Sequence, residues 1–390
     1  MKSILIIHQS SELYGSDKTI LFFCKELDKT KYFPIVVIPS DGPLKREFEK
    51  ENIQVVIAPV LKLYRNIVNP KNIFTFYKDY FASMKILKKL HEEHNFQLVY
   101  SHTLAVLIGF FFAKKNKIKH LWHVQEIINK PAFVNKAFKK LLSLKANHKA
   151  IYDSIQTMKF WTKNSEILQN KSDFVWNGLN LDEKYNTSEE EIREIRESFF
   201  KSENNQIVIG LIGRINGWKG QQLLLDAYKL VRNDSNYKNT KLVFVGSAPP
   251  NQDFFVEDLK TKIGELNFQE YVIIVPFQQN IWKFWDSIDI AVVPSTEPEP
   301  FGMVAIEAMA AKKPTIVANH GGLQEIVIHD QTGFLFEPRN ATDLAKHLKL
   351  LINDDNKRKS FGESGYSRVK EVFSMKNHTD KLEEIFQNLI

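Results

Sequence analysis

The sequence predicts an α/β protein built from two doubly wound domains with parallel sheets. Short runs of β-branched residues alternate with amphipathic helical stretches along nearly the whole chain, which is the pattern of strands joined by crossover helices. With 390 residues, the chain is longer than a single hydrophobic core usually serves, so two domains are expected. Residues 180–204 are polar and acid-rich and separate two such series, and we place the domain boundary near residue 180.

The first series begins with the apolar run 3–7, which is too short for a signal peptide and has the length of a buried strand. The most apolar stretch, 107–113, is followed at once by lysines, so no membrane span is expected. The single cysteine, Cys24, lies in an apolar helical stretch and is expected in the core, which fits a reducing compartment. Strands are predicted at 3–7, 34–38, 54–58, 96–102, 119–124, 149–154 and 173–178, and helices near 16–28, 43–51 and 104–115.

The second series opens with a capped helix, in which Ser188 is the N-cap and Glu191 follows three residues later. Two tandem doubly wound domains would place the functional cleft between them, at the carboxyl ends of the strands. Strands are predicted at 206–213, 241–246, 271–277, 290–295, 314–319 and 333–338, and helices at 219–232, 253–266, 280–286, 301–311, 322–328, 341–352 and 375–390.

The loop after strand 206–213 carries the first candidate site. Its glycines allow backbone N–H groups to approach a ligand, and the helix that follows favours an anion at its N-terminus. These glycines are Gly213, Gly217 and Gly220. Arg214 and Lys219 add two cations, which together suit a diphosphate, although a tight turn with incidental surface charges is the alternative. A nicotinamide-binding domain is disfavoured, because the next strand ends in Gly246-Ser247 rather than in an acid.

The second candidate site is the stretch STEPEPFGMVAIEAMA at 295–310. Pro300 suits the first turn of a helix, which places Glu299 just before that helix and Glu307 about two turns into it. Two carboxylates spaced in this way can accept hydroxyl groups from different parts of one ligand. The alternative is that Glu299 only caps the helix and Glu307 is solvated. The amides at the helix start are free to bind an anion or sugar hydroxyls: Gly302, Met303 and Val304.

Charge is unevenly distributed along the chain, whose formal net charge is +7. Residues 101–150 contain ten lysines and one acid, whereas residues 251–300 contain three lysines and nine acids. The lysine-rich segment 101–150 suggests an anionic partner, although a solvated lysine-rich face would have the same excess of lysines. Residues 131–149 have the pattern of a basic amphipathic helix, which would either suit a membrane surface or pack on its own sheet. No aromatic-interleaved basic motif is present, so no nucleic-acid partner is expected.

These motifs resemble those of the GT-B retaining glycosyltransferases of family 4. EPFGMVAIEAMA (299–310) is similar to that family's pattern of two glutamates with seven residues between them. GRINGWKG (213–220) resembles its glycine–arginine–lysine phosphate loop, and GGLQEIVIHDQTGFLFEP (321–338) resembles a further segment of the same domain. In the first half, WHVQEI (122–127) and VWNGLN (175–180) resemble shorter family segments, so the resemblance covers nearly the whole chain.

The resemblance implies a GT-B fold, in which two Rossmann-like domains face a central cleft. Residues 1–180 would form the acceptor side, 181–373 would bind a nucleotide-sugar donor, and 374–390 would pack back on the first domain. The family's double glycine near the N-terminus is Tyr14-Gly15 here, and Gly15 would let its loop approach the donor diphosphate.

The resemblance also implies a role for each matching residue. Arg214 and Lys219 would neutralise the departing diphosphate. Glu299 would hold hydroxyl groups of the transferred sugar, Glu307 would hold the nucleotide ribose, and His123 would contact the sugar from the first domain. The remaining donor contacts would come from a strand-end glycine, an aromatic residue near the base and the start of the second-domain helix: Gly213, Phe277, Phe301, Gly302, Met303 and Val304.

A member of this family would be a hexosyltransferase that retains the anomeric configuration, with a UDP-sugar rather than a GDP-sugar as donor. Its acceptor would be a glycan or a polyprenyl-diphosphate-linked sugar in surface polysaccharide synthesis. The sequence has no D-x-D motif and an arginine–lysine pair can replace a metal, so neither metal nor cofactor is expected. A cytoplasmic location is expected, with docking on the inner face of the membrane as a further expectation. The alternative is a non-catalytic subunit that keeps the fold and binds a lipid or protein.

Overall fold

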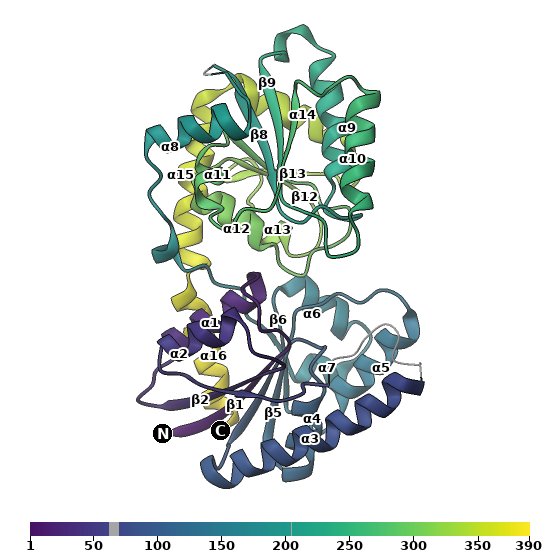
Figure 1. The fold of residues 1–390 in the computed structure, drawn as a ribbon, viewed down its shortest axis with the longest axis vertical. Helices are drawn as coiled ribbons and strands as arrows, with labels where there is room; N and C mark the ends of the chain where they lie inside the picture. Colours follow the sequence, from purple (N-terminus) through teal and green to yellow (C-terminus); the bar gives the residue numbers. More distant parts are fainter. Residues whose placement is uncertain (62–69, 204) are drawn as a thin grey trace. The chain divides into compact units, whose positions relative to one another are not determined.

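The computed structural model describes residues 1–61, 70–203 and 205–390. The chain divides into two compact units: unit 1 is Met1–Gly178 with Met375–Ile390, and unit 2 is Leu179–Ser374. In each unit a parallel sheet is covered by helices (Figure 1). The predicted fold class, α/β with two Rossmann-like doubly wound domains, is confirmed.

The described part of unit 1 holds a 7-stranded parallel sheet in the order β3-β2-β1-β4-β5-β6-β7. The order therefore reverses between β1 and β4, as in other doubly wound sheets. The strands are β1 (Lys2–His8), β2 (Tyr32–Ile38), β3 (Gln54–Ile57), β4 (Leu98–His102), β5 (Lys119–Val124), β6 (Lys149–Tyr152) and β7 (Ser172–Phe174). The helices are α1 (Gly15–Glu26), α2 (Pro43–Lys50), α3 (Pro70–His94), α4 (Ile108–Asn116), α5 (Ala132–Ser143), α6 (Ile155–Thr162), α7 (Glu166–Asn170) and α16 (Met375–Leu389).

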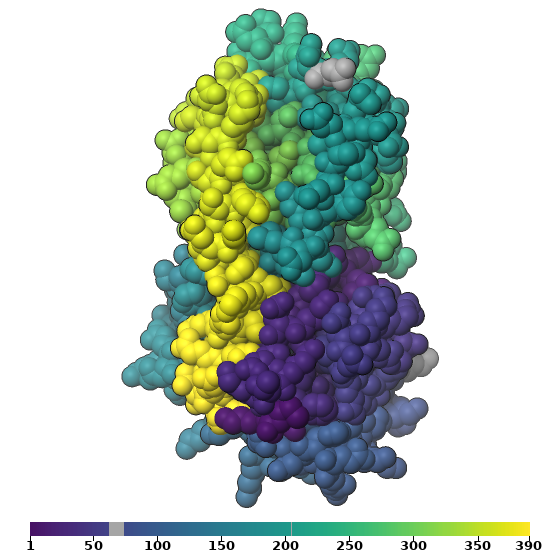
Figure 2. Space-filling view, turned by 90° about the vertical axis from the view of Figure 1, so that its left-hand side faces the viewer, coloured from purple at the N-terminus to yellow at the C-terminus, as the bar shows by residue number. Residues whose placement is uncertain are grey.

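Successive side chains of the central strands serve two separate cores, because they point to opposite faces of the sheet. Leu5 and Ile7 of β1 pack with side chains of α3 to α7 on one face. Ile4 and Ile6 pack with side chains of α1, α2 and α16 on the other. The helix α16, although it follows unit 2 in the chain, lies beside α1 (Figures 1 and 2). It contributes Leu382, Ile385 and Phe386 to the second core.

The long helix α3 has no counterpart among the predicted elements. Its inner side places Leu87 and Leu90 in the core, but its outer side begins with exposed aromatic residues. An amphipathic helix is recognised by an apolar face opposite a polar face, and aromatic residues on the outer side hide this pattern. These aromatic residues are Phe74, Tyr77 and Phe81. In the parts of the chain that the structure describes, no helix has both the length and the apolar character that a membrane crossing needs.

The basic helix α5 uses its apolar side internally. Phe138 and Leu142 are buried in the core of unit 1, and Val134 and Leu141 pack against the same core. Of the two alternatives for residues 131–149, the structure favours a helix packed on its own sheet.

The described part of unit 2 holds a 6-stranded parallel sheet in the order β10-β9-β8-β11-β12-β13, which reverses between β8 and β11. The strands are β8 (Ile207–Ile212), β9 (Thr240–Val245), β10 (Val272–Val275), β11 (Ile290–Val293), β12 (Thr315–Ala318) and β13 (Gly333–Phe336). The α-helices are α8 (Glu189–Glu194), α9 (Gln221–Arg232), α10 (Phe254–Glu265), α11 (Trp282–Asp286), α12 (Met303–Ala310), α13 (Leu323–Ile326), α14 (Ala341–Asn353) and α15 (Asp355–Val372).

Two predicted helix starts in unit 2 have different outcomes. The capping box at Ser188 is confirmed, because its hydroxyl accepts the N–H of Glu191 and the Glu191 carboxylate accepts the N–H of Ser188. The helix expected from Pro300 and Phe301 instead begins at Met303, with Gly302 as N-cap. Gly302 has a φ of 125°, which a proline-started helix would not need.

Candidate functional site

The candidate site of unit 2 lies where the strand order of its sheet reverses. Strands β8 and β11 pair in parallel, with Ile290 opposite Ile209, so the loops that follow them leave the same edge of the sheet. The first of these loops is 213–220 and the second is 294–302. Ligands of open parallel sheets bind at such a reversal. The topology therefore brings together the two motifs that the sequence marks as candidate sites.

Lys219 and Glu299 meet across these two loops. The Lys219 Nζ lies 2.8 Å from the Glu299 Oε1, and Glu299 is only 4% exposed. Ser295, just after β11, donates a second hydrogen bond from its hydroxyl to the same carboxylate oxygen. The ammonium also stands 4.6 Å from the ring centroid of Trp218. The site thus holds one positive and one negative side chain together, where a ligand with phosphate and hydroxyl groups could contact both.

Hydrogen bonds fix the loop that carries Lys219. The Asn216 side-chain oxygen accepts the N–H groups of Trp218 and Lys219 at 3.1 and 2.9 Å. The carbonyl of Trp218 accepts the N–H of Thr296 at 2.8 Å, which joins the two loops directly. Gly220 closes the turn with a φ of 83°, and a Cβ there would lie 1.9 Å from the carbonyl oxygen of Pro294. Only glycine fits this position.

A third loop, after β12, contacts the backbone on either side of the Glu299 turn through hydrogen bonds to the carbonyls of Ser295 and Glu299. Nε2 of His320 lies 2.7 Å from the carbonyl oxygen of Ser295, and burial lowers the pKa of His320, so the neutral ring donates this bond. The N–H of Gly322 donates to the carbonyl of Glu299 at 2.8 Å. Gly321 has a φ of 58°, and a Cβ there would lie 2.4 Å from the same carbonyl oxygen. The double glycine therefore lets this loop approach the backbone of Glu299.

The other donor-side residues lie around this pair with different exposures. Arg214 is exposed, and Glu307 is partly exposed on α12. Met303 and Val304 form the first turn of α12 and are partly exposed. Phe277, after β10, is exposed, and its N–H donates to the hydroxyl of Ser247 at 3.0 Å. Their contacts with a donor stay predictions.

The structure changes the setting of two residues whose backbone contacts with a donor stay predictions. Phe301 precedes α12 instead of lying in its first turn, and its buried ring packs against Phe373 at 5.8 Å between centroids. The N–H of Gly213 donates to the carbonyl of Val245 at 2.9 Å, so this amide completes the sheet. The Gly213 N–H is thus bonded within the sheet, and Phe301 lies before the first turn of α12.

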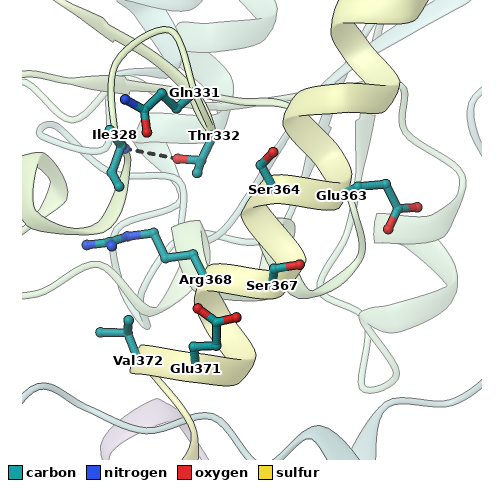
Figure 3. Close-up of a pocket in the computed structure, with 9 residues that line it drawn as sticks. All are labelled: Ile328, Gln331, Thr332, Glu363, Ser364, Ser367, Arg368, Glu371 and Val372. Atoms are coloured by element: carbon teal, nitrogen blue, oxygen red, sulfur yellow. Dashed lines mark hydrogen bonds between the residues drawn. The ribbon is translucent and has the colours of Figure 1, made fainter.

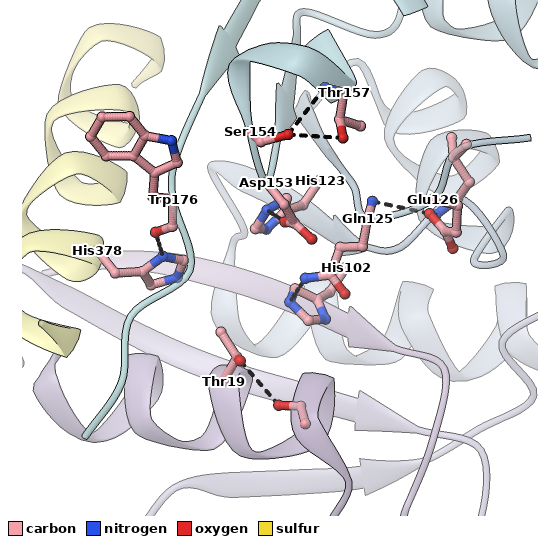
Figure 4. Close-up of polar contacts among 12 residues, drawn as sticks. Thr19, His102, His123, Gln125, Glu126, Asp153, Ser154, Thr157, Trp176 and His378 are labelled. Carbon is pink, nitrogen blue, oxygen red and sulfur yellow. Dashed lines mark hydrogen bonds and ion pairs between the residues drawn. The ribbon is translucent and has the colours of Figure 1, made fainter. Parts of the chain in front are cut away.

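Unit 1 places histidines at its own strand-order reversal. His8 in β1 is paired with His102 in β4, which in turn is paired with His123 in β5. All three side chains are buried, and Figure 4 shows two of them, His102 and His123. A buried histidine is a satisfied structural group in most proteins, and for His8 and His102 the structure provides hydrogen-bond partners.

His123 uses both ring nitrogens inside unit 1. The Tyr100 hydroxyl lies 2.7 Å from its Nδ1, and an Asp153 carboxylate oxygen lies 2.7 Å from its Nε2. The contact with Asp153 is close, but its orientation does not satisfy a directed hydrogen bond. Burial and then the Asp153 charge raise the pKa of Tyr100 well above its usual range, so this phenol stays protonated. The predicted contact of His123 with a sugar is not part of this arrangement and stays a prediction.

Gly15 begins α1 in unit 1. A Cβ at this position would meet no atom within 4 Å, and the backbone is not left-handed. The fold therefore does not require glycine here, which is the opposite of Gly321 in unit 2.

A separate hollow of about 450 Å³ lies in unit 2 between α15 and the loop before β13 (Figure 3). Arg368 lines it, but its guanidinium donates to the carbonyls of Glu325 and Ile326, both at 2.8 Å. The lining contains none of the predicted site residues, and the hollow is not part of the candidate site. The lining residues are Ile328, Gln331, Thr332, Glu363, Ser364, Ser367, Arg368, Glu371 and Val372.

The sequence reasoning missed several residues that shape the sites. Trp218 stands beside Lys219 in a motif whose charges and glycines alone predict a site. Ser295 and His320 follow neighbouring strands, and a search for polar residues just after each strand would have found both. Asp17 and Asp153 bind histidines from other elements, and nothing local in the sequence marks them.

Two doubly wound parallel sheets are the architecture of the GT-B fold. Comparisons with known proteins agree with this fold. Residues 191–368 match the family model described as "Glycosyl transferases group 1". The structure is similar to that of Anabaena HepE in complex with UDP and glucose, with a TM-score of 0.80 and 22% identity, covering 98% of this chain and 99% of that one.

Two relatives extend the comparison to sequence. The capsular polysaccharide biosynthesis glycosyltransferase CapM of Staphylococcus aureus is 24% identical over 94% of this chain and 92% of its own length. The Campylobacter jejuni N-acetylgalactosamine-N,N'-diacetylbacillosaminyl-diphospho-undecaprenol 4-alpha-N-acetylgalactosaminyltransferase is 26% identical over 64% of this chain and 63% of its own. Together these findings support a glycosyltransferase with the GT-B fold.

Proposed function

We propose that the protein transfers a hexose-type sugar from a UDP-sugar to a glycan or lipid-linked acceptor, with retention of anomeric configuration. The single observation that carries the proposal is the Lys219–Glu299 pair at the strand-order reversal of unit 2. The neighbours named above give further support, because HepE is described with UDP and glucose and the Campylobacter enzyme with a diphospho-undecaprenol acceptor.

In this proposal the chain's own residues stabilise the leaving group. When a donor binds, Lys219 leaves Glu299 and, with Arg214, neutralises the charge that develops on the departing diphosphate. Glu299 is then free to accept hydrogen bonds from sugar hydroxyls, and Glu307 accepts those of the ribose. The bond from the anomeric carbon to the phosphate oxygen breaks on the same face on which the acceptor oxygen bonds. The departing phosphate oxygen takes the acceptor's proton.

A panel of nucleotide sugars tests the proposal. The protein is incubated with UDP- and GDP-linked hexoses and N-acetylhexosamines, and release of the nucleoside diphosphate is measured together with the anomeric configuration of the product. Release from at least one UDP-sugar is expected. Absence of both turnover and nucleotide binding across the panel would instead favour the non-catalytic subunit.

We also propose that unit 1 contacts an anionic membrane surface from the cytoplasmic side through α3, not through α5. Phe74, Tyr77 and Phe81 are 75%, 60% and 67% exposed and share one side of α3, because they are spaced three and four residues apart. Exposed lysines continue on this outer side in the second half of the helix: Lys85, Lys88 and Lys89. Aromatic residues followed by cations suit the interface of an anionic bilayer.

Sedimentation with phosphatidylglycerol vesicles tests this contact. Binding is expected at low salt and should weaken at high salt. Replacing the three aromatic residues by serine should abolish it, whereas Ile167→Ser, at a 62% exposed position on α7, is the matched control and should not. Equal binding of the triple variant and the control would remove α3 from the proposal.

A further inference from the structure

A continuous line of hydrogen-bonding groups crosses unit 1 at the strand ends. His8 Nε2 lies 2.6 Å from an Asp17 carboxylate oxygen, and His8 Nδ1 lies 2.9 Å from His102 Nδ1. His102 Nε2 lies 2.9 Å from the amide nitrogen of Gln125 (Figure 4). We call these four residues the histidine network. Asp17, His8 and His102 are buried, whereas Gln125 is partly exposed.

The chemistry of the groups fixes the position of each proton. The Asp17 carboxylate can only accept, so His8 donates from Nε2–H. A neutral His8 then accepts at Nδ1, and His102 must donate to it from Nδ1–H. His102 is left with Nε2 as an acceptor, and this nitrogen receives the amide N–H of Gln125. Every contact is satisfied with both rings neutral, and the side-chain nitrogen of Gln125 is held against His102.

The surroundings favour this neutral state. Burial, followed by the neighbouring imidazoles of His8, His123 and His378, holds the pKa of His102 well below its usual range. His123 contacts the His102 ring at 5.2 Å between centroids, and the Asp153 carboxylate lies on the far side of His123. Burial and the imidazole of His123 likewise lower the pKa of His378 to about 4, although its bond to a backbone carbonyl opposes this.

Both ends of the network reach loops at the strand ends. The second carboxylate oxygen of Asp17 accepts the N–H of Tyr14 at 2.9 Å, directly before Gly15. At the other end, Gln125 follows β5. The next residue, Glu126, accepts the N–H of Leu104 at 3.1 Å. This bond holds the loop after β4, in which Thr103 has a φ of 88°. Such a backbone is strained for a β-branched residue, and strain of this kind gathers at ligand sites.

We propose that Gln125 binds a hydroxyl group of the carbohydrate acceptor through its side-chain carbonyl oxygen, and that Asp17, His8 and His102 position it. This inference rests on the proposed function. Among the residues that the structure describes, no hydrogen-bond donor is recorded for that oxygen. Because the amide nitrogen is held by His102, the carbonyl oxygen is the group that remains to accept a hydroxyl hydrogen. Burying the imidazoles of His8 and His102 costs desolvation free energy. If Gln125 only packed against its neighbours, apolar residues of the same volume would stabilise the fold as well.

The network also has a reversed state. If a proton is added, His8 donates from both nitrogens and His102 must donate from Nε2–H, so Gln125 has to turn its carbonyl oxygen inward. Its amide N–H groups would then face the ligand in place of an acceptor. Gln125→Glu imposes the same proton positions on the two rings at neutral pH, because a carboxylate can only accept from His102, but its second oxygen still presents an acceptor to the ligand. Gln125→Met keeps the volume but removes both polar atoms.

Steady-state kinetics with the acceptor varied tests the role of Gln125. Gln125→Met should raise KM for the acceptor by about tenfold, the effect of one lost hydrogen bond, with kcat and the donor KM within twofold. Gln125→Glu should change the acceptor KM less, because its second carboxylate oxygen can still accept the hydroxyl hydrogen. Gln169→Met, on the exposed side of α7, is the control and should change nothing. An unchanged acceptor KM in Gln125→Met would overturn the proposal.

Nitrogen-15 NMR of the histidine rings provides a readout that a packing role would not affect. In the wild-type protein at pH 7.5, His102 should carry its proton on Nδ1, and in Gln125→Glu the proton should move to Nε2. A wild-type His102 protonated on Nε2 would overturn the assignment. If no nucleotide sugar is turned over, the proposed function fails separately. Gln125 is then judged by whether its side-chain amide resonance shifts when methyl hexosides are added, and no shift with any of them overturns the inference.

Discussion

The two units share the same strand-order reversal but place different groups there, charged side chains in unit 2 and buried imidazoles in unit 1. Unit 2 places a cation and a carboxylate, Lys219 and Glu299, on loops at its strand-order reversal. Unit 1 places buried imidazoles in the strands themselves, with His8, His102 and His123 side by side. A charge held in a loop can change partner when a ligand arrives, whereas a buried imidazole inside a strand is held between fixed neighbours. The fold therefore sets where the sites lie, and the strand-end residues decide what each can do.

Removing the cation of unit 2 is expected to have the largest effect. Lys219→Met should lower kcat about 100- to 1000-fold at saturating donor, because one preorganised charge on the leaving group is lost. Turnover of a UDP-sugar provides the measurement. Lys260→Met, an exposed lysine of α10 paired with Glu257, is the control. An unchanged kcat would refute the role of Lys219.

The same variant leaves the Glu299 carboxylate buried without its cation, which itself destabilises the fold. Lys219→Met combined with Glu299→Gln separates the two effects. The double variant should regain thermal stability relative to the single one, whereas its activity should not return.

Acid should weaken unit 1 more than unit 2. Burial lowers the pKa of His120 to about 3 and that of His378 to about 4, and it holds the pKa of His102 well below its usual range. These pKa values lie below the unfolded value of about 6.5, so the unfolded chain takes up protons first as pH falls. Each of these histidines then reduces the free energy of unfolding by about 1.4 kcal/mol per pH unit between about pH 6.5 and its folded pKa, and its contribution is complete above pH 6.5. Burial raises the pKa of Glu126 to about 7, so this carboxyl offsets one of the three histidines in the same range, and the other two give the net loss in unit 1.

Hydrogen exchange between pH 7.5 and 5.5, corrected for the intrinsic rates, measures this difference. Protection of β4 and β5 should fall more steeply than protection of β8 and β11. His120→Gln should reduce the slope in unit 1 only. If protection falls equally with pH in the two units, the expected greater acid sensitivity of unit 1 is wrong.

The glycines of the two sites should respond differently to alanine. Gly321→Ala should lower the free energy of unfolding by roughly 1–3 kcal/mol, because its φ is 58° and the new Cβ would meet the Glu299 carbonyl. Gly15→Ala should leave it nearly unchanged, since a Cβ there meets nothing within 4 Å. Urea unfolding of both variants is the measurement. A loss of donor affinity in Gly15→Ala without a loss of stability would support the predicted approach of a diphosphate.

The smallest effect is expected from metal removal. Because Lys219 and Arg214 are proposed to neutralise the diphosphate without a metal ion, excess chelator should change turnover by less than about twofold. Activity that disappears with chelator and returns only with a divalent ion would show that these side chains do not suffice.

Local patterns in the sequence were enough for most strands and for the loops that carry Lys219 and Glu299. Their direct contact was not predicted, because 80 residues separate them and only the adjacency of β8 and β11 brings them together. The histidine network was missed for the same reason, since His8 and His102 meet through strand order. The helix α3 was missed because Phe74 and Phe81 face outward, against the pattern that reveals a surface helix.

The position of α16 at the end of the chain has a consequence for the order in which the two units fold. Unit 2 is one continuous segment, whereas the core of unit 1 includes Leu382, Ile385 and Phe386, which follow it in the chain. A nascent chain that has just released residue 374 from the ribosome can complete unit 2, but the first unit to be translated still lacks part of its interior. We therefore expect the usual N-terminal-first order of domain folding to be inverted here, with apolar side chains of α1 uncovered until residue 386 has left the ribosome.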